Sequence, residues 1–181
     1  NWPPDIISNL IAIACQHDDP KPGTFPLGSY KKIEKLNCED LILGSINCAR
    51  GCAFIAISEL LWKHPELADH FNVTLKHAAK EESPAVLFAV MCCAVPWYNI
   101  DKAYSKELFD TLLERDLRTL GVEQAWDLLN RFYVLSPQFY TEKLRNACES
   151  SIADLRTCAA QMIANLAIMD CWTTNDILEL A

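Results

Sequence analysis

The stretch "SINCARGCAFIAISELLWKHPELADHF", residues 45–71, decides the fold of this chain. Its first part is almost continuously apolar. Its second part begins at His64-Pro65, where the residue before a proline resists the α conformation. This pattern predicts a helix over residues 47–63, a break at the proline, and another helix over residues 66–80. Two helices joined by a tight turn are therefore the expected structural unit of the chain.

The same unit recurs along the sequence. Four similar frames surround an alanine: "ARGCAFIAI", "AVLFAVMCC", "VEQAWDLLN" and "LRTCAAQMI". These alanines, Ala53, Ala89, Ala125 and Ala159, lie 36, 36 and 34 residues apart. The first three frames are each followed by a second, more charged helix. A small residue at a fixed position allows a neighbouring helix to approach closely. A period in the mid-thirties with two helices per unit is typical of a stacked α-solenoid.

The limits of the helices follow from capping residues and prolines. Ser83 and Ser136 each precede a proline, which suits a capping hydroxyl followed by the first helical position. Asn47 or Ser45 is expected to cap the first helix of the first repeat. No segment shows the two-residue period of a β-strand. The predicted helices span residues 5–15, 47–63, 66–80, 84–96, 104–116, 123–135, 137–149, 151–169 and 175 onward.

We therefore expect an all-α fold made of one HEAT-like domain over residues 1–181, an α-solenoid of antiparallel helix pairs of the armadillo-repeat type. The tetratricopeptide repeat has a similar period, but its Trp-Leu-Gly-Tyr frame is missing. The segment "QHDDPKPGTFPLGSYKKIEK" holds three prolines and two glycines, so residues 16–46 are expected to form an irregular arm. Since the chain starts without methionine and ends as a helix begins, we expect a piece of a longer protein. The expected repeats span about 47–82, 83–118, 119–150 and 151–181.

Composition narrows the class of protein. The 181 residues suffice for one domain with a substantial core. The net charge is −8, and none of the segments 1–46, 47–82, 83–121, 122–150 and 151–181 has a positive balance, which argues against a nucleic-acid partner apart from a local basic patch at Lys31, Lys32 and Lys35. No apolar run approaches the roughly 20 residues that span a bilayer, and no signal peptide opens the chain, so no membrane partner is expected. The nine cysteines are odd in number and irregularly spaced, which favours reduced thiols and a cytoplasmic location.

The cysteines and histidines of the opening stretch raise the question of a metal site. Cys48 and Cys52 share one helix face, His64 lies at the turn, and His70 and His77 lie on the next helix. Zinc needs about four converging ligands, but this spacing matches no usual zinc pattern, and the apolar residues between the cysteines explain the segment as core. No metal ion and no other cofactor is predicted. Nucleophile-elbow, zincin, dinucleotide-binding and Walker motifs are also missing, so no catalytic residue is predicted and the chain is not expected to be an enzyme.

Arg50 and Gly51 lie side by side near the start of the first repeat. Glycine inside a helix costs about 1 kcal/mol relative to alanine, so Gly51 predicts close packing or a first-turn position. Arg50 is expected to form a structural ion pair with Asp40 or Glu39, because partly buried arginines are normally paired. The alternative is a contact between Arg50 and an anionic ligand.

The segments "HDDPKP" at 17–22, "INCARGCAFIAISELLW" at 46–62 and "SPAVLFAVMCCAV" at 83–95 resemble the HEAT-like region of large bacterial signal-transduction ATPases of the STAND type. The resemblance is closest to members related to antiviral (phage-defence) NTPases, and it departs at Leu87, where the family has an arginine. It implies that the repeats act as a sensor or scaffold, while separate modules bind ATP and act as effector. The resemblance therefore implies a protein ligand, or other domains of the parent chain, as partner and no catalytic residue here. The matching frame consists of Asn47, Arg50, Gly51, Ala53, Leu60, Leu61 and Trp62.

Three functions remain open at this point. The first is a non-catalytic, protein-binding scaffold or sensor domain of a larger regulatory NTPase. Trp97 and Tyr98, at a predicted helix end, are its favoured interface anchors, followed by Trp126 and Tyr133, because aromatic residues dominate such surfaces. The second is a structural or oligomerisation segment with a self-complementary apolar patch. The third is a DNA glycosylase on a HEAT-like scaffold, which requires a basic concave face that the charge balance does not provide.

Overall fold

The computed structural model describes residues 3–20, 36–81 and 83–169, and these are all-helical, without a β-strand. Short 3₁₀-helices at Pro65–Leu67, Leu117–Gly121 and Tyr133–Leu135 lie between the longer helices. The predicted helix from residue 175 onward lies outside the described residues. The α-helices are α1 (Pro4–Gln16), α2 (Cys38–Ile46), α3 (Ala49–Lys63), α4 (Ala68–Ala78), α5 (Pro84–Ile100), α6 (Lys102–Arg115), α7 (Glu123–Phe132), α8 (Pro137–Cys148) and α9 (Ala153–Ile168).

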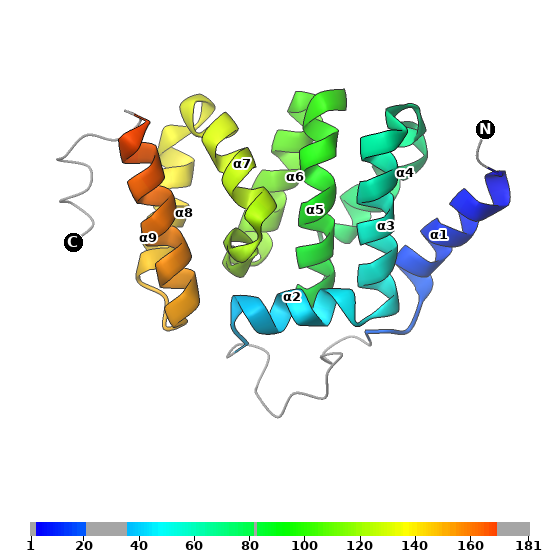
Figure 1. Cartoon of the computed structure of the whole chain (residues 1–181), viewed down its shortest axis with the longest axis horizontal. Coiled ribbons are helices and arrows are strands. Elements are labelled where there is room, and N and C mark those ends of the chain that lie inside the picture. The colour runs from blue at the N-terminus through cyan, green and yellow to red at the C-terminus, as the bar shows by residue number, and fades with distance from the viewer. Residues whose placement is uncertain (1–2, 21–35, 82, 170–181) are drawn as a thin grey trace.

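The long helices stand side by side in two layers. Helices α3, α5, α7 and α9 form one layer, α4, α6 and α8 lie behind it, and α1 leans against α3 at one end (Figure 1). The most extensive packing joins α3 to α5 and α5 to α6. The four alanines of the sequence period all lie in the first layer and are buried. Their small side chains allow the neighbouring helices to approach closely.

Helix α5 is the centre of the core. It contacts α2, α3, α4, α6 and α7, and nearly every residue from Pro84 to Trp97 is buried. A helix that is apolar all round is expected in such a place. Across the described part of the chain, no single helix has the length and apolar character needed to cross a membrane, although α2 and α3, bent by 84°, meet that test as a pair.

Pro96 lies inside α5, which continues to Ile100 instead of ending at residue 96 as predicted. Proline has no N–H to donate to the carbonyl four residues earlier, that of Cys92. The Ser58 hydroxyl of α3 donates to this carbonyl at 2.8 Å. The neighbouring helix thus supplies the hydrogen bond that Pro96 cannot, and α5 runs on.

The predicted irregular arm over residues 16–46 is wrong at both ends. Residue 16 closes α1, and residues 38–46 form α2, which lies across the lower ends of the upright helices (Figure 1). The Asn37 side chain accepts from the Asp40 amide at 2.7 Å, and the Asp40 carboxylate accepts from the Asn37 amide at 3.1 Å. This reciprocal capping box starts α2 after the proline-rich stretch. Residues 21–35 lie outside the described part of the chain.

Helix α3 is capped by Cys48, whose sulfur accepts from the Gly51 amide at 3.3 Å, and not by Asn47 or Ser45 as predicted. Both predicted caps instead donate to carbonyls in the last turn of α2, Asn47 at 2.7 Å and Ser45 at 2.7 Å. The sequence analysis predicted an irregular arm in place of α2, without helical carbonyls to accept these hydrogen bonds. It therefore assigned both side chains to the wrong helix. Likewise, Ser83 and Ser136 take the N-cap positions of α5 and α8, but neither side chain forms a capping hydrogen bond.

Candidate binding groove

A groove lies between α3, α5 and α7 on the first layer of helices. Its volume is about 330 Å³. Helix α5 forms the floor, α3 forms one wall and α7 forms the other. We call it the acidic groove, and it is lined by Ile55, Ser58, Glu59, Trp62, Cys92, Val95, Glu123, Gln124 and Asp127.

The lining residues follow helical spacing on each of the three helices. On α3, Ile55, Glu59 and Trp62 lie three or four residues apart and therefore share one face. Helix α3 packs against α1, α2 and α5, and this face is only partly covered by them. Trp62 is accordingly 52% exposed. A large aromatic side chain beside a groove is typical of an interface anchor.

The charges in the lining are all negative. Glu59 lies 3.5 Å from Lys63, but both side chains are well exposed, so this pair contributes little. Glu123 and Asp127, four residues apart on α7, form no ion pair within the described part of the chain. Like charges at this spacing destabilise a helix by about 0.2–0.5 kcal/mol. The α7 wall therefore holds two carboxylates that repel each other.

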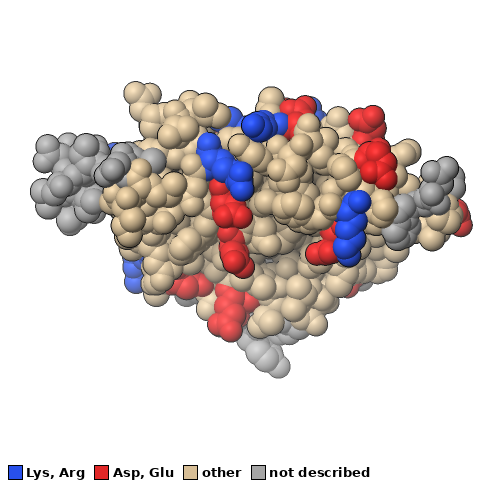
Figure 2. Space-filling view, turned by 45° about the horizontal axis from the view of Figure 1, so that its top comes forward, with Lys and Arg blue, Asp and Glu red and all other residues tan. Residues whose placement is uncertain are grey.

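Arg131, the next residue on the same face of α7, does not neutralise Asp127. Its guanidinium carbon lies 4.6 Å from the centre of the Tyr98 ring, which also has the Lys102 ammonium nitrogen at 5.3 Å. Figure 2 shows a broad uncharged surface on which acidic and basic side chains occur in small separate groups. The described residues on that side form no continuous basic surface, which a phosphate backbone would need.

Cys92 on the floor is a neutral thiol. Burial raises the pKa of Cys92 to about 11, and its sulfur lies 3.6 Å from the Phe88 carbonyl as a hydrogen-bond donor. The thiolate is the nucleophilic form of cysteine, so Cys92 contributes apolar surface and not reactivity near neutral pH. None of the lining residues is a histidine that could serve as its base.

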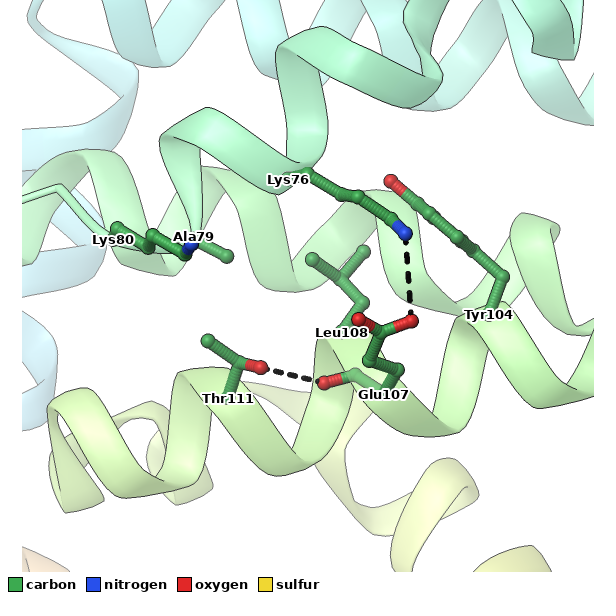
Figure 3. Close-up of a pocket in the computed structure, with 7 residues that line it drawn as sticks. All are labelled: Lys76, Ala79, Lys80, Tyr104, Glu107, Leu108 and Thr111. Carbon is green, nitrogen blue, oxygen red and sulfur yellow. Dashed lines mark hydrogen bonds and ion pairs between the residues drawn. The ribbon is translucent and has the colours of Figure 1, made fainter.

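A second, smaller pocket of about 70 Å³ lies in the other layer, between α4 and α6. Figure 3 shows Lys76, Tyr104 and Glu107 directed toward one another there. The Lys76 nitrogen lies 3.5 Å from the Glu107 carboxylate and 5.2 Å from the centre of the Tyr104 ring, and the Tyr104 hydroxyl donates to the Asn72 carbonyl at 2.8 Å. Burial raises the pKa of Tyr104. These polar groups are partnered within the fold, and the space suits a few water molecules.

Of the two favoured anchors, Trp97 is a core residue. It is 3% exposed and its ring centre lies 4.6 Å from that of Tyr104. The prediction placed Trp97 at a helix end, but α5 continues beyond it to Ile100, and the ring is packed in the core against Tyr104 of α6. Tyr98 is half-buried, with Arg131 on its ring and its ring centre 5.5 Å from that of Phe132.

The other two aromatic candidates are also packed against the fold. Trp126 is half-buried against the core. Tyr133 is buried, and its hydroxyl lies 2.9 Å from that of Thr141. Among the described residues, the exposed aromatic side chain beside the acidic groove is that of Trp62, which was not among the predicted anchors.

Arg50 connects three parts of the chain. Its Nε donates to the Ala14 carbonyl of α1 at 3.0 Å, and its terminal nitrogen pairs with Glu81 in the turn before α5. The side chains of Arg50 and Glu81 are 8% and 14% exposed. The predicted partners, Asp40 and Glu39, are wrong, because Asp40 belongs to the capping box of α2 and Glu39 is exposed.

The cysteines and histidines that suggested a zinc site have different surroundings in the structure. Cys48 is the buried cap of α3, Cys52 is exposed, and the His64 ring lies 3.1 Å from Glu66. Within the described ranges, no three side chains of His, Cys, Asp or Glu are grouped to hold a metal ion.

Gly51 allows α2 to approach α3. A methyl group on Gly51 would lie 1.9 Å from the Ser45 carbonyl oxygen. Both predicted explanations, a first-turn position and close packing, describe this residue.

The groove residues Trp62, Glu123 and Asp127 were missed by sequence reasoning. The apolar residues around most of α3 gave no clear signal, because α3 packs against α1, α2 and α5 and most of that surface is buried against them. Comparisons of the chain with protein-family models, with curated proteins and with solved structures find no match. What the described residues define is an all-α fold with an acidic groove on its first layer of helices.

Proposed function

We propose that this chain is a non-catalytic, protein-binding domain that receives its ligand in the acidic groove. The observation that carries the proposal is the exposed Trp62 ring beside an apolar floor, with carboxylates on both walls. Interfaces of this kind combine a buried aromatic anchor with a polar rim. The raised pKa of Cys92 and the absence of histidine from the lining support a binding role over a catalytic one.

We further propose that the architecture is an α-solenoid of HEAT-like helix pairs. The two-layer arrangement supports this, since α3 and α4, α5 and α6, and α7 and α8 each contribute one helix to each layer. The buried alanines at the sequence period support it as well. In such stacks each pair buries its apolar face against the next, and one layer lines an extended binding surface.

The resemblance of the "INCARGCAFIAISELLW" frame extends the proposal. The domain would act as sensor or scaffold within a larger bacterial regulatory NTPase of the STAND type, in phage defence. The test is the parent reading frame. A Walker loop, G-x-x-x-x-G-K-[ST], encoded in the same frame is expected, and a parent without an NTPase module contradicts this part of the proposal.

A structural or oligomerisation role is the alternative, because Ile6 and Ile13 of α1 are 44% and 40% exposed at one end of the stack. Sedimentation velocity of the full chain separates the two functions. The binding proposal expects a monomer, whereas the alternative expects a dimer that Ile6→Lys with Ile13→Lys converts to monomer. The acidic groove does not favour a DNA glycosylase, whose substrate backbone is an anion.

The binding function itself is tested with a photo-crosslinking amino acid placed at position 62 in cells of the source organism. Position 135, also an exposed apolar residue but outside the groove, is the control. One protein is expected to crosslink at position 62 and not at 135. After purification it should bind the unmodified chain and lose that binding with Trp62→Ala. Equal crosslinking at both positions contradicts the proposal.

A further inference from the structure

We propose that the occupant of the acidic groove is a basic amphipathic helix, with apolar side chains on the α5 floor beside Trp62 and Lys or Arg side chains on the carboxylates of both walls. This inference rests on the proposed binding function and specifies the chemistry of its partner. Three properties of the groove lead to this inference: its walls are helices, its floor is apolar, and its charged side chains are all negative.

The walls determine the secondary structure of the occupant. All three elements around the groove are α-helices, whose backbone groups are paired along their length except in the first turn of α7, where the N–H groups of a helix have no helical partner. They offer an incoming extended chain no edge to pair with, unlike a β-sheet. A helical occupant pairs its own backbone polar groups and needs no such edge, so this groove favours a helix.

The floor determines the apolar face of the occupant. Cys92 and Val95 on the α5 floor, together with Ile55 and Trp62 on the adjoining α3 wall, supply thiol, aliphatic and aromatic groups. The Ser58 hydroxyl is already used by the Cys92 carbonyl. A volume of about 330 Å³ has room for a few side chains and not for a folded domain. Successive apolar residues on one face of a helix fit this shape.

The charges determine the sign of the occupant's polar face. Glu59 lies on the α3 wall and Glu123 and Asp127 lie on the α7 wall, and the lining holds no lysine or arginine. Cationic side chains flanking an apolar stripe would thus meet carboxylates on both sides. They would also relieve the repulsion between Glu123 and Asp127. An acidic or neutral helix gains neither effect.

The test uses three fluorescently labelled 18-residue peptides at about 0.15 M salt, followed by anisotropy. The first contains leucine at helical spacing with lysine elsewhere, the second has the same composition in scrambled order, and the third has glutamate for lysine. The first peptide is expected to bind the full chain at least tenfold more tightly than the other two. The scrambled peptide controls for general attraction between cations and a chain of net charge −8.

Matched variants locate the site. Glu123→Gln with Asp127→Asn should weaken binding of the first peptide by roughly fivefold to tenfold. Glu114→Gln with Glu142→Gln makes the same charge change at exposed residues of α6 and α8, and should change it by less than about twofold. Trp62→Ala should cost about thirtyfold, whereas Leu135→Ala should cost little. Circular dichroism and melting curves confirm that each variant is folded.

The outcomes separate this inference from the proposed function. Equal binding of ordered and scrambled lysine peptides, or equal effects of the two charge variants, overturns the inference. So does tighter binding of the glutamate peptide at the groove, or no binding of any peptide. In each of these cases the crosslinking at position 62 still decides the proposed function, because that experiment makes no assumption about the partner's charge.

Discussion

Replacing Arg50 by alanine tests how the first helices are held together. The Arg50 side chain is 8% exposed, donates to the Ala14 carbonyl at 3.0 Å and pairs with Glu81, whose side chain is 14% exposed. Truncation removes both contacts and leaves the Glu81 carboxylate without its guanidinium where water has little access. Removing one partner of a buried pair costs about 3–5 kcal/mol. For a chain of this size the melting temperature should fall by roughly 6–20 °C.

Urea unfolding followed by far-ultraviolet circular dichroism measures the loss. Lys63→Ala is the matched control, since it breaks the Lys63–Glu59 pair, whose side chains are 70% and 64% exposed. Its cost should stay below about 0.5 kcal/mol. Arg50→Lys keeps the charge but not the fork of donors, so its cost should lie between the two. If Arg50→Ala is no more destabilising than Lys63→Ala, the structural role of this ion pair is refuted.

Three further predictions concern the contacts around α3 and α5. Gly51→Ala should lower the free energy of unfolding by about 2–3 kcal/mol, because the new methyl group would lie 1.9 Å from the Ser45 carbonyl oxygen. The control is Cys52→Ala, which changes an exposed residue on the same turn. Equal effects of the two substitutions would contradict the packing argument. Ser58→Ala should lower the free energy of unfolding by about 1–2 kcal/mol, because the Cys92 carbonyl loses its donor. The loss should be smaller in a Pro96→Ala background, where the N–H of residue 96 can donate to that carbonyl. An equal loss in both backgrounds refutes the idea that Ser58 allows α5 to continue past Pro96. The contribution of Cys92 to the unfolding free energy should be constant below pH 9, the ordinary pKa of cysteine, and be lost between pH 9 and 11, because its thiol stays protonated in the folded state while it ionises in the unfolded state. Cys92→Ala should reduce the fall in unfolding free energy over that range by about 2–3 kcal/mol, and identical pH profiles would count against the raised pKa.

The helical class and most helix limits could be predicted because their causes are local. Proline at the start of α5 and α8, and the His64-Pro65 break, act within one or two residues of themselves. Helix α2 was missed because its capping box follows a stretch rich in proline and glycine. The end of α5 was misplaced because continuation past Pro96 depends on Ser58, 38 residues earlier in the sequence.

The groove could not be predicted for a different reason. Which face of α3 remains uncovered depends on the distance that α5 imposes between α3 and α7, and no short sequence pattern records that distance. The partner of Arg50 was missed in the same way, since Glu81 follows it by 31 residues and reaches it only in the packed structure. Local chemistry identified an arginine that needs an anion, but tertiary packing selected which one.

Helix α2 makes contacts that a simple row of repeats lacks. It packs against α3, α5 and the 3₁₀-helix at Leu117–Gly121, and the Cys38 amide at its start donates to Asp154 of α9 at 2.6 Å. In a stack where each repeat touches only its neighbours, the ends can fray independently and the whole can flex like a spring. Because α2 contacts several repeats at once, it restricts this independent movement of the ends. The amides of α3 and α9 should therefore exchange with deuterium through one shared opening event, and a partner meets a rigid platform whose shape is set before it arrives.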